Sequence, residues 1–523
     1  MDTNKKEMYW KTAGVAIVFM AFAVLMLSQA TASGLWYDEA IEYFYSKVLV
    51  GPVPVSATNN MYERICSTYQ PPLYNFVMYL WLCIFDSGDL SFRIPGILFT
   101  LAGAVGLFKT LRIHGSYCLA LLGTVTYLGT YQVVYYALEC AEYNLMLCCE
   151  CWMLYFGLAY LERHSNRTLV GFFTFAVLAV YSQYGAVFVV VPLYLLLAYD
   201  VIRNKHKFAG IIGCTLGIGA PSALVLFVFF LLPQMLRQGS AMVSHAPVFR
   251  HGGFLDFFVG AISVVKWIFM PVSGVPSAEA GLLAFGGFTA VLCMIAFIIN
   301  KKYREIFLAL AVSYVLYFAA VVCSFYGYNN WSPDMVGADN FGERYSLFFA
   351  PLFVVTSVIG VYYGMQIFRS KIMWILLRAV SIACVVFVCG TMVTTMRLGW
   401  TKSDVREATQ SWYENGGPEV TTLVHDWTKG GFCFYLMHNV EFEEEYSENI
   451  VLCDLWIRTA SSQTMRERLK DQGIFDLDRF YYVGPYVKYR DSYDTFCQVA
   501  QEEGYDITVL FQGMTTLLEL QKR

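Results

Sequence analysis

The sequence predicts a polytopic α-helical membrane protein with a small α/β domain at its C-terminal end. Of the 523 residues, 57% are hydrophobic and only 15% are charged, and the mean hydropathy is +0.50. Long apolar runs recur from residue 12 to residue 397. After residue 398 the density of charge rises, and the apolar runs shorten to the length of strands. Soluble proteins carry more charge, and apolar runs of about 20 residues are typical of membrane helices.

The composition also argues against several classes of function. The formal net charge of −4 gives no indication of nucleic-acid binding. The sequence lacks the GxxxxGK[ST] loop that an ATP-driven transporter would need. Most of the 15 cysteines lie in apolar runs, and the cluster Cys148 to Cys151 lacks CxxC spacing. These cysteines are therefore expected to pack as small apolar side chains, and no metal site is predicted.

The predicted membrane spans are connected by short polar segments. Their approximate ranges are 12–31, 92–111, 116–136, 142–161, 168–182, 184–200, 209–232, 278–299, 306–328, 345–367 and 373–397. Residues 73–85 and 256–270 are apolar but too short for a bilayer, so we expect two non-spanning helices there. This interpretation corresponds to about 11–13 transmembrane helices.

Basic residues set the predicted orientation, because Lys and Arg gather in cytoplasmic loops. If 73–85 does not span, the basic clusters from Lys5 to Lys371 all fall on one side of the membrane. If it spans, every cluster after the first moves to the opposite side. We therefore expect a multi-pass protein of the cell membrane with a cytoplasmic N-terminus. The C-terminal domain and most polar residues are then extracytoplasmic.

The change in composition predicts a membrane domain over 1–397 and an α/β domain over 398–523. Apolar runs predict strands at 421–425, 451–455, 480–483 and 508–511. Amphipathic stretches predict helices at 403–414, 462–472 and 493–503. Strands and helices alternate, which is typical of an α/β domain.

Two adjacent carboxylates follow the first span, in the stretch Leu35–Ala40. One interpretation makes Asp38 the N-cap of a helix over Glu39–Val50. The other places an acid/base pair at the mouth of a membrane cavity, where a carboxylate can accept a proton from a substrate. Because the two acids are adjacent, their side chains diverge, and we expect them to have different roles.

Three arginines are candidates for binding an anionic group on the same side. Arg64 lies in the first external loop, Arg93 starts a span, and Arg344 lies at a membrane edge. A charged side chain in a span is costly, so Arg93 is expected to have a partner or a function. The alternative for each arginine is extension to the interface or pairing with a nearby acid.

Four blocks occur in an order that resembles the GT-C superfamily of membrane glycosyltransferases. They are LWYDEA at 35–40, QPPLYNFVMYLW at 70–81 followed by SFRIPGILFTLAG at 91–103, YYALECAEYNLML at 135–147, and GERYSLFFAPLF at 342–353. YSQY at 181–184 matches a position that often reads YTHY. The chain is similar to the bacterial branch that includes protein O-mannosyltransferases and aminoarabinose transferases.

This resemblance implies a transfer of sugar from a polyprenyl-phosphate donor to an acceptor on the extracytoplasmic face. The acceptor would be a glycan, lipid or protein, and membrane lipids surround the enzyme. Asp38 would be the base, Glu39 would orient the acceptor or an arginine, and Arg64, Arg93 and Arg344 would bind the donor phosphate. The other predicted substrate-binding residues are Gln70, Glu139, Tyr143, Gln183 and Glu343.

The chain departs from the family pattern at three positions. Gln70 and Gln183 stand where relatives often have His, and Ala141 stands where relatives often have Arg. These changes remove charge that could contact phosphate, and they argue against a histidine metal site. We expect no obligatory cofactor, and assistance by a divalent cation stays open.

A lipid or solute transporter, or a flippase without a chemical step, is the alternative function. Such proteins often show paired halves with charged or broken helices at the membrane midplane. No such pairing is visible here, and the ionisable residues concentrate at one membrane face. This distribution favours the transferase.

Overall fold

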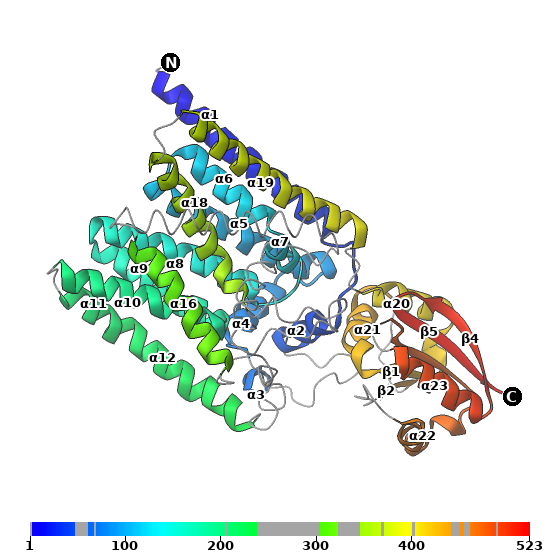
Figure 1. The fold of residues 1–523 in the computed structure, drawn as a ribbon. Helices are drawn as coiled ribbons and strands as arrows, with labels where there is room; N and C mark the ends of the chain where they lie inside the picture. Colours follow the sequence, from blue (N-terminus) through cyan, green and yellow to red (C-terminus); the bar gives the residue numbers. More distant parts are fainter. Residues whose placement is uncertain are drawn as a thin grey trace. The chain divides into compact units, whose positions relative to one another are not determined.

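The computed structural model contains two compact units (Figure 1). The bundle unit comprises Met1–Leu27, Ile65–Tyr74 and Ile94–Gly399, and the mixed unit comprises Ser28–Arg64, Asn75–Arg93 and Trp400–Arg523. The described residues are 3–47, 61–66, 70–204, 208–237, 304–322, 346–367, 371–399, 403–440, 449–453, 461–487 and 490–523. The mixed unit combines two N-terminal stretches with the C-terminal one.

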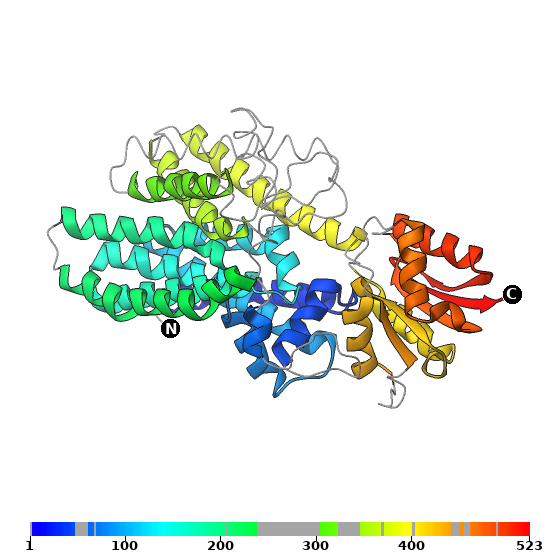
Figure 2. The same ribbon diagram turned by 90° about the horizontal axis from the view of Figure 1, so that it is seen from below.

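The bundle unit is built from apolar helices that lie side by side (Figure 2, cyan to green). Their bounds are α1 Thr3–Gln29, α5 Asp89–His114, α6 Tyr117–Gly129, α7 Tyr131–Ala137, α8 Tyr143–Arg163, α9 Asn166–Ser182, α10 Val187–Arg203, α11 Phe208–Cys214, α12 Ala220–Leu226, α16 Arg304–Val322, α18 Ala350–Ile367 and α19 Lys371–Gly399. The short helix α4, Leu73–Leu82, has residues in both units, as do α1 and α5. Every predicted span except 278–299 coincides with one or more of these helices. Residues 278–299 and the predicted helix 256–270 lie outside the described residues.

Within the described residues, five helices are long and apolar enough to cross a membrane. They are Tyr9–Gln29, Asp89–Ile113, Tyr143–Arg163, Tyr184–Arg203 and Ala209–Arg237. The predicted span 116–136 is bent by 60° between α6 and α7. The bend lies at Thr130, whose backbone is extended, with φ −69° and ψ 121°. The helix of ten residues at α4 is about 15 Å long, which is half the thickness of a bilayer core.

Small residues on α5 allow close approach between helices of the bundle unit. A Cβ added at Gly96 would lie 2.5 Å from the carbonyl oxygen of Ala137 in α7. One added at Gly103 would lie 3.0 Å from the Cα of Cys148 in α8. Membrane helices gain packing contacts where small residues let their backbones come together. Gly96 and Gly103 therefore set the spacing of α5 against α7 and α8.

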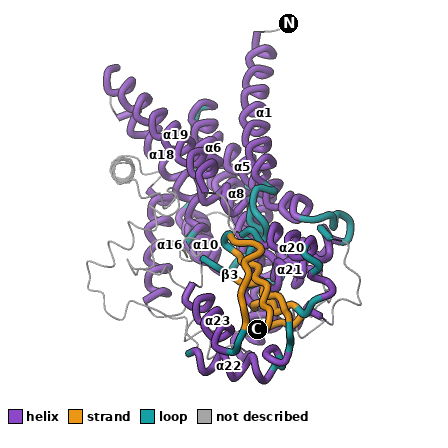
Figure 3. Tube along the Cα trace, turned by 90° about the vertical axis from the view of Figure 1, so that its right-hand side faces the viewer, coloured by secondary structure: helices purple, strands orange, loops and turns teal. Residues whose placement is uncertain are grey.

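The mixed unit contains a five-stranded sheet with strand order β2-β1-β3-β5-β4 (Figure 3, orange). The strands are β1 Thr422–His425, β2 Ile450–Cys453, β3 Arg479–Pro485, β4 Tyr505–Gln512 and β5 Thr515–Lys522. β1 pairs in parallel with β2 and β3, whereas β5 is antiparallel to β3 and β4. Its helices are α2 Tyr37–Lys47, α20 Val405–Glu414, α21 Asp426–His438, α22 Ser462–Asp471 and α23 Arg490–Glu502, and α3 Met61–Cys66 has residues in both units. The predicted α/β domain is confirmed.

Two elements of this domain were not predicted from the sequence. β5 follows β4 after a two-residue turn, so the two strands form a hairpin. The sequence predicts only one short strand here, at 508–511. α21 contains Gly430 and Gly431, which disfavour a helix by about 1 kcal/mol each relative to Ala. Both glycines have a packing reason. Added Cβ atoms would lie 3.0 Å from the Cβ of Ala40 and 3.1 Å from the carbonyl oxygen of Leu35, respectively.

His425 joins β1 to α21 as a helix cap. Its Nδ1 accepts a hydrogen bond of 3.1 Å from the backbone N–H of Trp427. The side chain is buried, and this burial lowers the pKa of His425 from 6.5 to about 4. The His425-Asp426 pair is thus the end of β1 and the start of α21.

Replacing His425 by Asn should make the stability of the protein less dependent on pH. The folded state keeps His425 neutral down to about pH 4, whereas the unfolded chain binds a proton below about pH 6.5. Stability should therefore fall as pH falls through this window, by up to about 1.4 kcal/mol per pH unit from this group. The measurement is thermal unfolding of both proteins from pH 7 to pH 4.5.

An Asn at 425 keeps a capping acceptor, and His425→Ala serves as the matched variant that loses both the cap and the titration. His425→Ala should be about 1 kcal/mol less stable than His425→Asn at pH 7. If the unfolding temperature depended on pH equally in all three proteins, this account would be wrong.

Candidate active site

The acidic pair lies in the first turn of α2. The helix begins at Tyr37, so Asp38 is inside the helix and is not its N-cap, which corrects the expectation of a helix from Glu39. Glu39 reaches back and accepts a hydrogen bond of 3.2 Å from the backbone N–H of Trp36. Acids in a first turn interact favourably with the helix dipole. Asp38 is partly exposed, whereas Glu39 has no exposed surface.

Glu39 forms a buried ion pair with Arg93, at the start of α5. The closest approach is 3.0 Å, from Nη2 of Arg93 to Oε2 of Glu39, and Nε and Nη2 both contact Oε1. Arg93 is 2% exposed. Two charges removed from water stabilise a structure only when the pair is well aligned and its remaining hydrogen-bonding groups are satisfied.

Arg93 also binds the loop between α1 and α2. Its Nη1 donates to the carbonyl oxygens of Ala30 and Ser33 at 2.7 Å each, and its Nη2 approaches the carbonyl oxygen of Gly34 at 3.3 Å. The donors of the guanidinium are therefore directed at protein acceptors. This geometry favours a role for Arg93 in holding Glu39 and the loop over direct binding of phosphate.

Asp89 forms a second buried junction in the mixed unit. Its Oδ2 accepts a hydrogen bond of 2.9 Å from the hydroxyl of Tyr435 in α21, and Arg406 of α20 contacts the same oxygen at 3.1 Å. The Tyr435 hydroxyl in turn accepts the backbone N–H of Leu35 at 2.7 Å. The chain just before the acidic pair is thus bound to side chains about 400 residues later.

Aromatic rings border the acidic pair. Tyr37 stacks on Trp427 of α21, with ring centroids 4.2 Å apart and an interplanar angle of 4°. Both rings are partly exposed. Aromatic stacking of this kind contributes about 0.5–1.5 kcal/mol beyond burial of area. The stack fixes the residue directly before Asp38 on the C-terminal domain.

A third polar cluster surrounds Asp86. This carboxylate forms an ion pair with Lys47 of α2 and accepts a hydrogen bond from Tyr43 at 3.1 Å, and Nε2 of His438 in α21 lies 3.1 Å from its Oδ1. Asp86, Asp89 and their partners were not predicted from the sequence. Their position could have indicated them. Both acids lie just before Arg93, and a cation expected to be buried needs acidic neighbours.

Arg64 lies in the mixed unit with Asp38, Glu39 and Arg93. It is 2% exposed, and its Nη1 donates to the carbonyl oxygen of Phe44 in α2. Of the predicted site residues, the structure thus brings Glu39 and Arg93 into direct contact and places Asp38 and Arg64 in the same unit. Glu343 and Arg344 lie outside the described residues.

The remaining predicted site residues belong to the bundle unit. Gln234 donates to the backbone carbonyl of Gln70 at 2.7 Å. The side chain of Gln183 accepts from the N–H of Gly185 at 2.5 Å, which caps the turn between α9 and α10. Glu139 and Tyr143 are 3% and 4% exposed. Gln183 therefore has a local structural role, whatever else it contacts.

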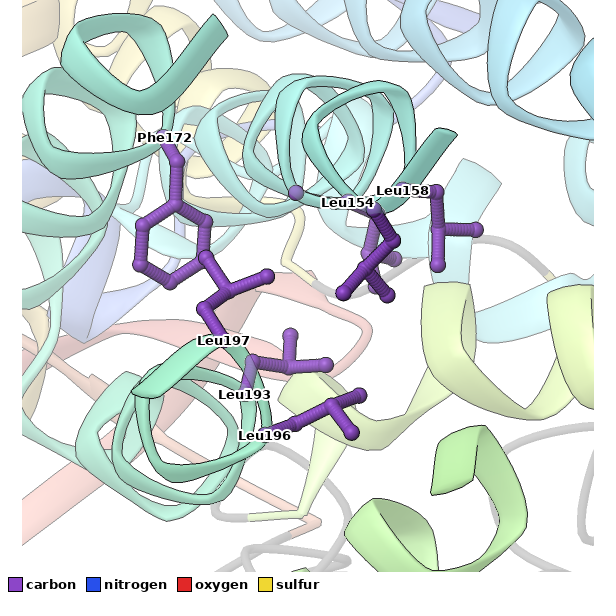
Figure 4. Close-up of a pocket in the computed structure, with 8 residues that line it drawn as sticks. Leu154, Leu158, Phe172, Leu193, Leu196 and Leu197 are labelled. Carbon is purple, nitrogen blue, oxygen red and sulfur yellow. The ribbon is translucent and has the colours of Figure 1, made fainter. Parts of the chain in front are cut away.

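A cavity in the bundle unit is lined entirely by Gly157 and apolar side chains of α8, α9 and α10 (Figure 4). Leu154, Phe172 and Leu193 are among them. Such a lining offers no group for acid or base chemistry. Among the described residues, no three His, Cys, Asp or Glu side chains are grouped to hold a metal ion.

The chain has the GT-C fold of membrane glycosyltransferases. Residues 69–224 match the family model described as dolichyl-phosphate-mannose-protein mannosyltransferase. The structure is similar to apo ArnT from Cupriavidus metallidurans, with a TM-score of 0.52 and 13% identity over 97% of this chain and 98% of that chain. The resemblance predicted from the sequence blocks is confirmed.

Two further solved structures are similar to this chain. ArnT from Cupriavidus metallidurans bound to undecaprenyl phosphate gives a TM-score of 0.51 and 12% identity, over 97% of this chain and 98% of that one. The Archaeoglobus fulgidus oligosaccharyltransferase in complex with Zn and sulfate gives a TM-score of 0.51 and 11% identity, over 94% of this chain and 71% of that one. A comparison with curated proteins found no match. At these identities the likeness establishes the fold.

Replacing Arg93 by Ala should destabilise the protein strongly, because it leaves the buried Glu39 carboxylate and the loop carbonyls without their donor. The expected loss is about 3–5 kcal/mol. Arg523→Ala is the matched control, since it removes an exposed ion pair with Asp506 in the same unit and should have little effect. Thermal unfolding of the purified proteins is the measurement.

The double variant Arg93→Met with Glu39→Leu should be more stable than Arg93→Ala, because no charge stays buried. If Arg93→Ala unfolds at the same temperature as Arg523→Ala, the ion pair does not support the site.

Proposed function

We propose that the protein is a membrane glycosyltransferase that moves a sugar from a polyprenyl phosphate to an acceptor on the extracytoplasmic face. The observation that carries the proposal is the acidic pair of α2. One acid is buried against Arg93, and the other, Asp38, is partly exposed beside it. The GT-C fold supports this function, as do a family model named for dolichyl-phosphate-mannose and an ArnT structure bound to undecaprenyl phosphate.

In the proposed reaction, an acceptor hydroxyl or amine attacks the anomeric carbon of the donor sugar. The new bond to the acceptor forms as the bond between the anomeric carbon and the phosphate oxygen breaks. The phosphate oxygen keeps the bonding electrons and leaves as the polyprenyl phosphate. The carboxylate of Asp38 accepts the proton of the acceptor, which makes it the general base.

Glu39 has a different role in this proposal. Its carboxylate is directed at Arg93 and at the N–H of Trp36, so it holds the first turn of α2 in place. Adjacent residues of a helix are rotated by about 100°, so one side chain can face the protein core while the next faces outward. This rotation explains how two neighbouring acids divide into a holding group and a base.

The leaving phosphate needs cationic donors. We propose Arg64 and Arg344 for this role, and we assign Arg93 to the support of Glu39. Gln70, Glu139, Tyr143, Gln183 and Glu343 are the proposed contacts to the rest of the substrates. The proposed acceptor is a glycan, a lipid or a protein.

Asp38→Asn should abolish detectable sugar transfer, because loss of a general base lowers the rate by about 10²- to 10⁴-fold. The measurement uses purified protein with a panel of undecaprenyl-phosphate sugars and follows loss of the donor. Asp471→Asn is the matched control, an exposed acid of the same unit. An Asp38→Asn protein that folds and turns over the donor normally would disprove the role of base.

The C-terminal domain should be accessible from outside the cell. A cysteine at Gln463, an exposed position in α22, should react with a membrane-impermeant maleimide on intact cells. A cysteine at Asn166, the exposed first residue of α9, should react only after lysis, since the connection between α8 and α9 is a predicted cytoplasmic loop. Labelling of the unmodified protein measures the background reaction of the native cysteines. The reverse labelling pattern would place the proposed chemistry on the cytoplasmic face.

A further inference from the structure

The loop between α1 and α2 is bound to the C-terminal domain through its backbone. Gly34 donates its N–H to the carbonyl oxygen of Ser403 at 2.9 Å, and Ser403 donates its own N–H to Ser33 Oγ at 3.1 Å. The Arg406 guanidinium contacts the carbonyl oxygen of Thr31 at 3.1 Å. Buried backbone groups need such partners. Here the partners come from α20 and the residues just before it.

Tyr435 of α21 binds the loop at Leu35, three residues before Asp38. Its hydroxyl has a single proton, and it accepts the N–H of Leu35 while donating that proton to Asp89. Burial raises the pKa of the Tyr435 hydroxyl, so the proton is retained for donation to Asp89. The hydroxyl therefore connects a backbone group three residues before Asp38 to the start of α5.

We propose that Tyr435 is a positioning residue for Asp38 and that the C-terminal domain is part of the catalytic site, an inference that rests on the proposed glycosyltransferase function. The loop before α2 has no regular structure of its own, and Ser403, Arg406, Tyr435 and Arg93 hydrogen-bond to it. These bonds fix where α2 begins, and hence where its first turn directs Asp38.

The packing of α21 on α2 supports the same role. The absence of a side chain at Gly431 admits the carbonyl oxygen of Leu35, and the absence of one at Gly430 admits Ala40. Tyr37 stacks on Trp427 of the same helix. Residues on both sides of Asp38 are thus held by one helix of the C-terminal domain.

The test compares Tyr435→Phe with Tyr505→Phe in the full-length protein. Each variant removes one buried hydroxyl of the same unit, since Tyr505 donates to the carbonyl oxygen of Leu477 at 2.6 Å, away from the loop. Hydrogen exchange should become faster in peptides covering residues 30–40 in Tyr435→Phe. In Tyr505→Phe those peptides should exchange as in the unmodified protein.

Turnover of the undecaprenyl-phosphate sugar that the unmodified protein uses is the second measurement. Tyr435→Phe should lower kcat by about 10- to 100-fold, because a misplaced catalytic group reduces rate steeply. KM for the donor should change less than about two-fold, since Asp38 does not bind the donor in this mechanism. Tyr505→Phe should keep both constants.

Unchanged exchange over residues 30–40 in Tyr435→Phe would overturn the inference, as would faster exchange with unchanged kcat. The exchange measurement needs no substrate. If the unmodified protein turned over no donor in the panel, the proposed function would fail, while the exchange result would still report whether Tyr435 holds the loop.

Discussion

The buried ion pair between Arg93 and Glu39 is the interaction on which the rest of the candidate site depends. A guanidinium with almost no exposure is tolerated only when its donors are matched by acceptors. Arg93 obtains them from one carboxylate and from the carbonyl oxygens of Ala30, Ser33 and Gly34. The end of α1, the loop, the start of α2 and the first turn of α5 therefore share one partner. None of them can shift without leaving a buried polar group unmatched.

Around this pair, the mixed unit combines segments that are far apart in the sequence. The loop before α2 and the residues up to Arg93 contact α20 and α21 through Asp89, Arg406 and Tyr435. Asp86 adds a second set of polar contacts between α2 and α21. The site is thus supported from the C-terminal domain as well as from α5. This arrangement gives the domain a physical role in the proposed reaction.

The sequence predicted the parts of this fold that depend on local composition. Apolar runs indicated the helices, the change in charge after residue 398 indicated the α/β domain, and the block order indicated the GT-C fold. The bend at Thr130 was not predicted. Helix α21 was not predicted either, because Gly430 and Gly431 have low helix propensity, and only their tertiary contacts explain them. Arg93 was expected to have a partner, but spacing could not show that the partner is Glu39, 54 residues earlier. The roles of the site residues remain predictions.

The contact between Leu35 and Tyr435 joins residues that are 400 positions apart. During synthesis, the loop leaves the ribosome early, whereas its partners at Ser403, Arg406 and Tyr435 are made near the end of the chain. The contacts of this loop with the C-terminal domain cannot form until nearly the whole chain has been translated. Closing so long a loop is entropically unfavourable. A product that stops before α21 would carry Asp38 but lack the groups that hold it. The order of synthesis thus leaves the acidic pair without its C-terminal support until the last domain has folded.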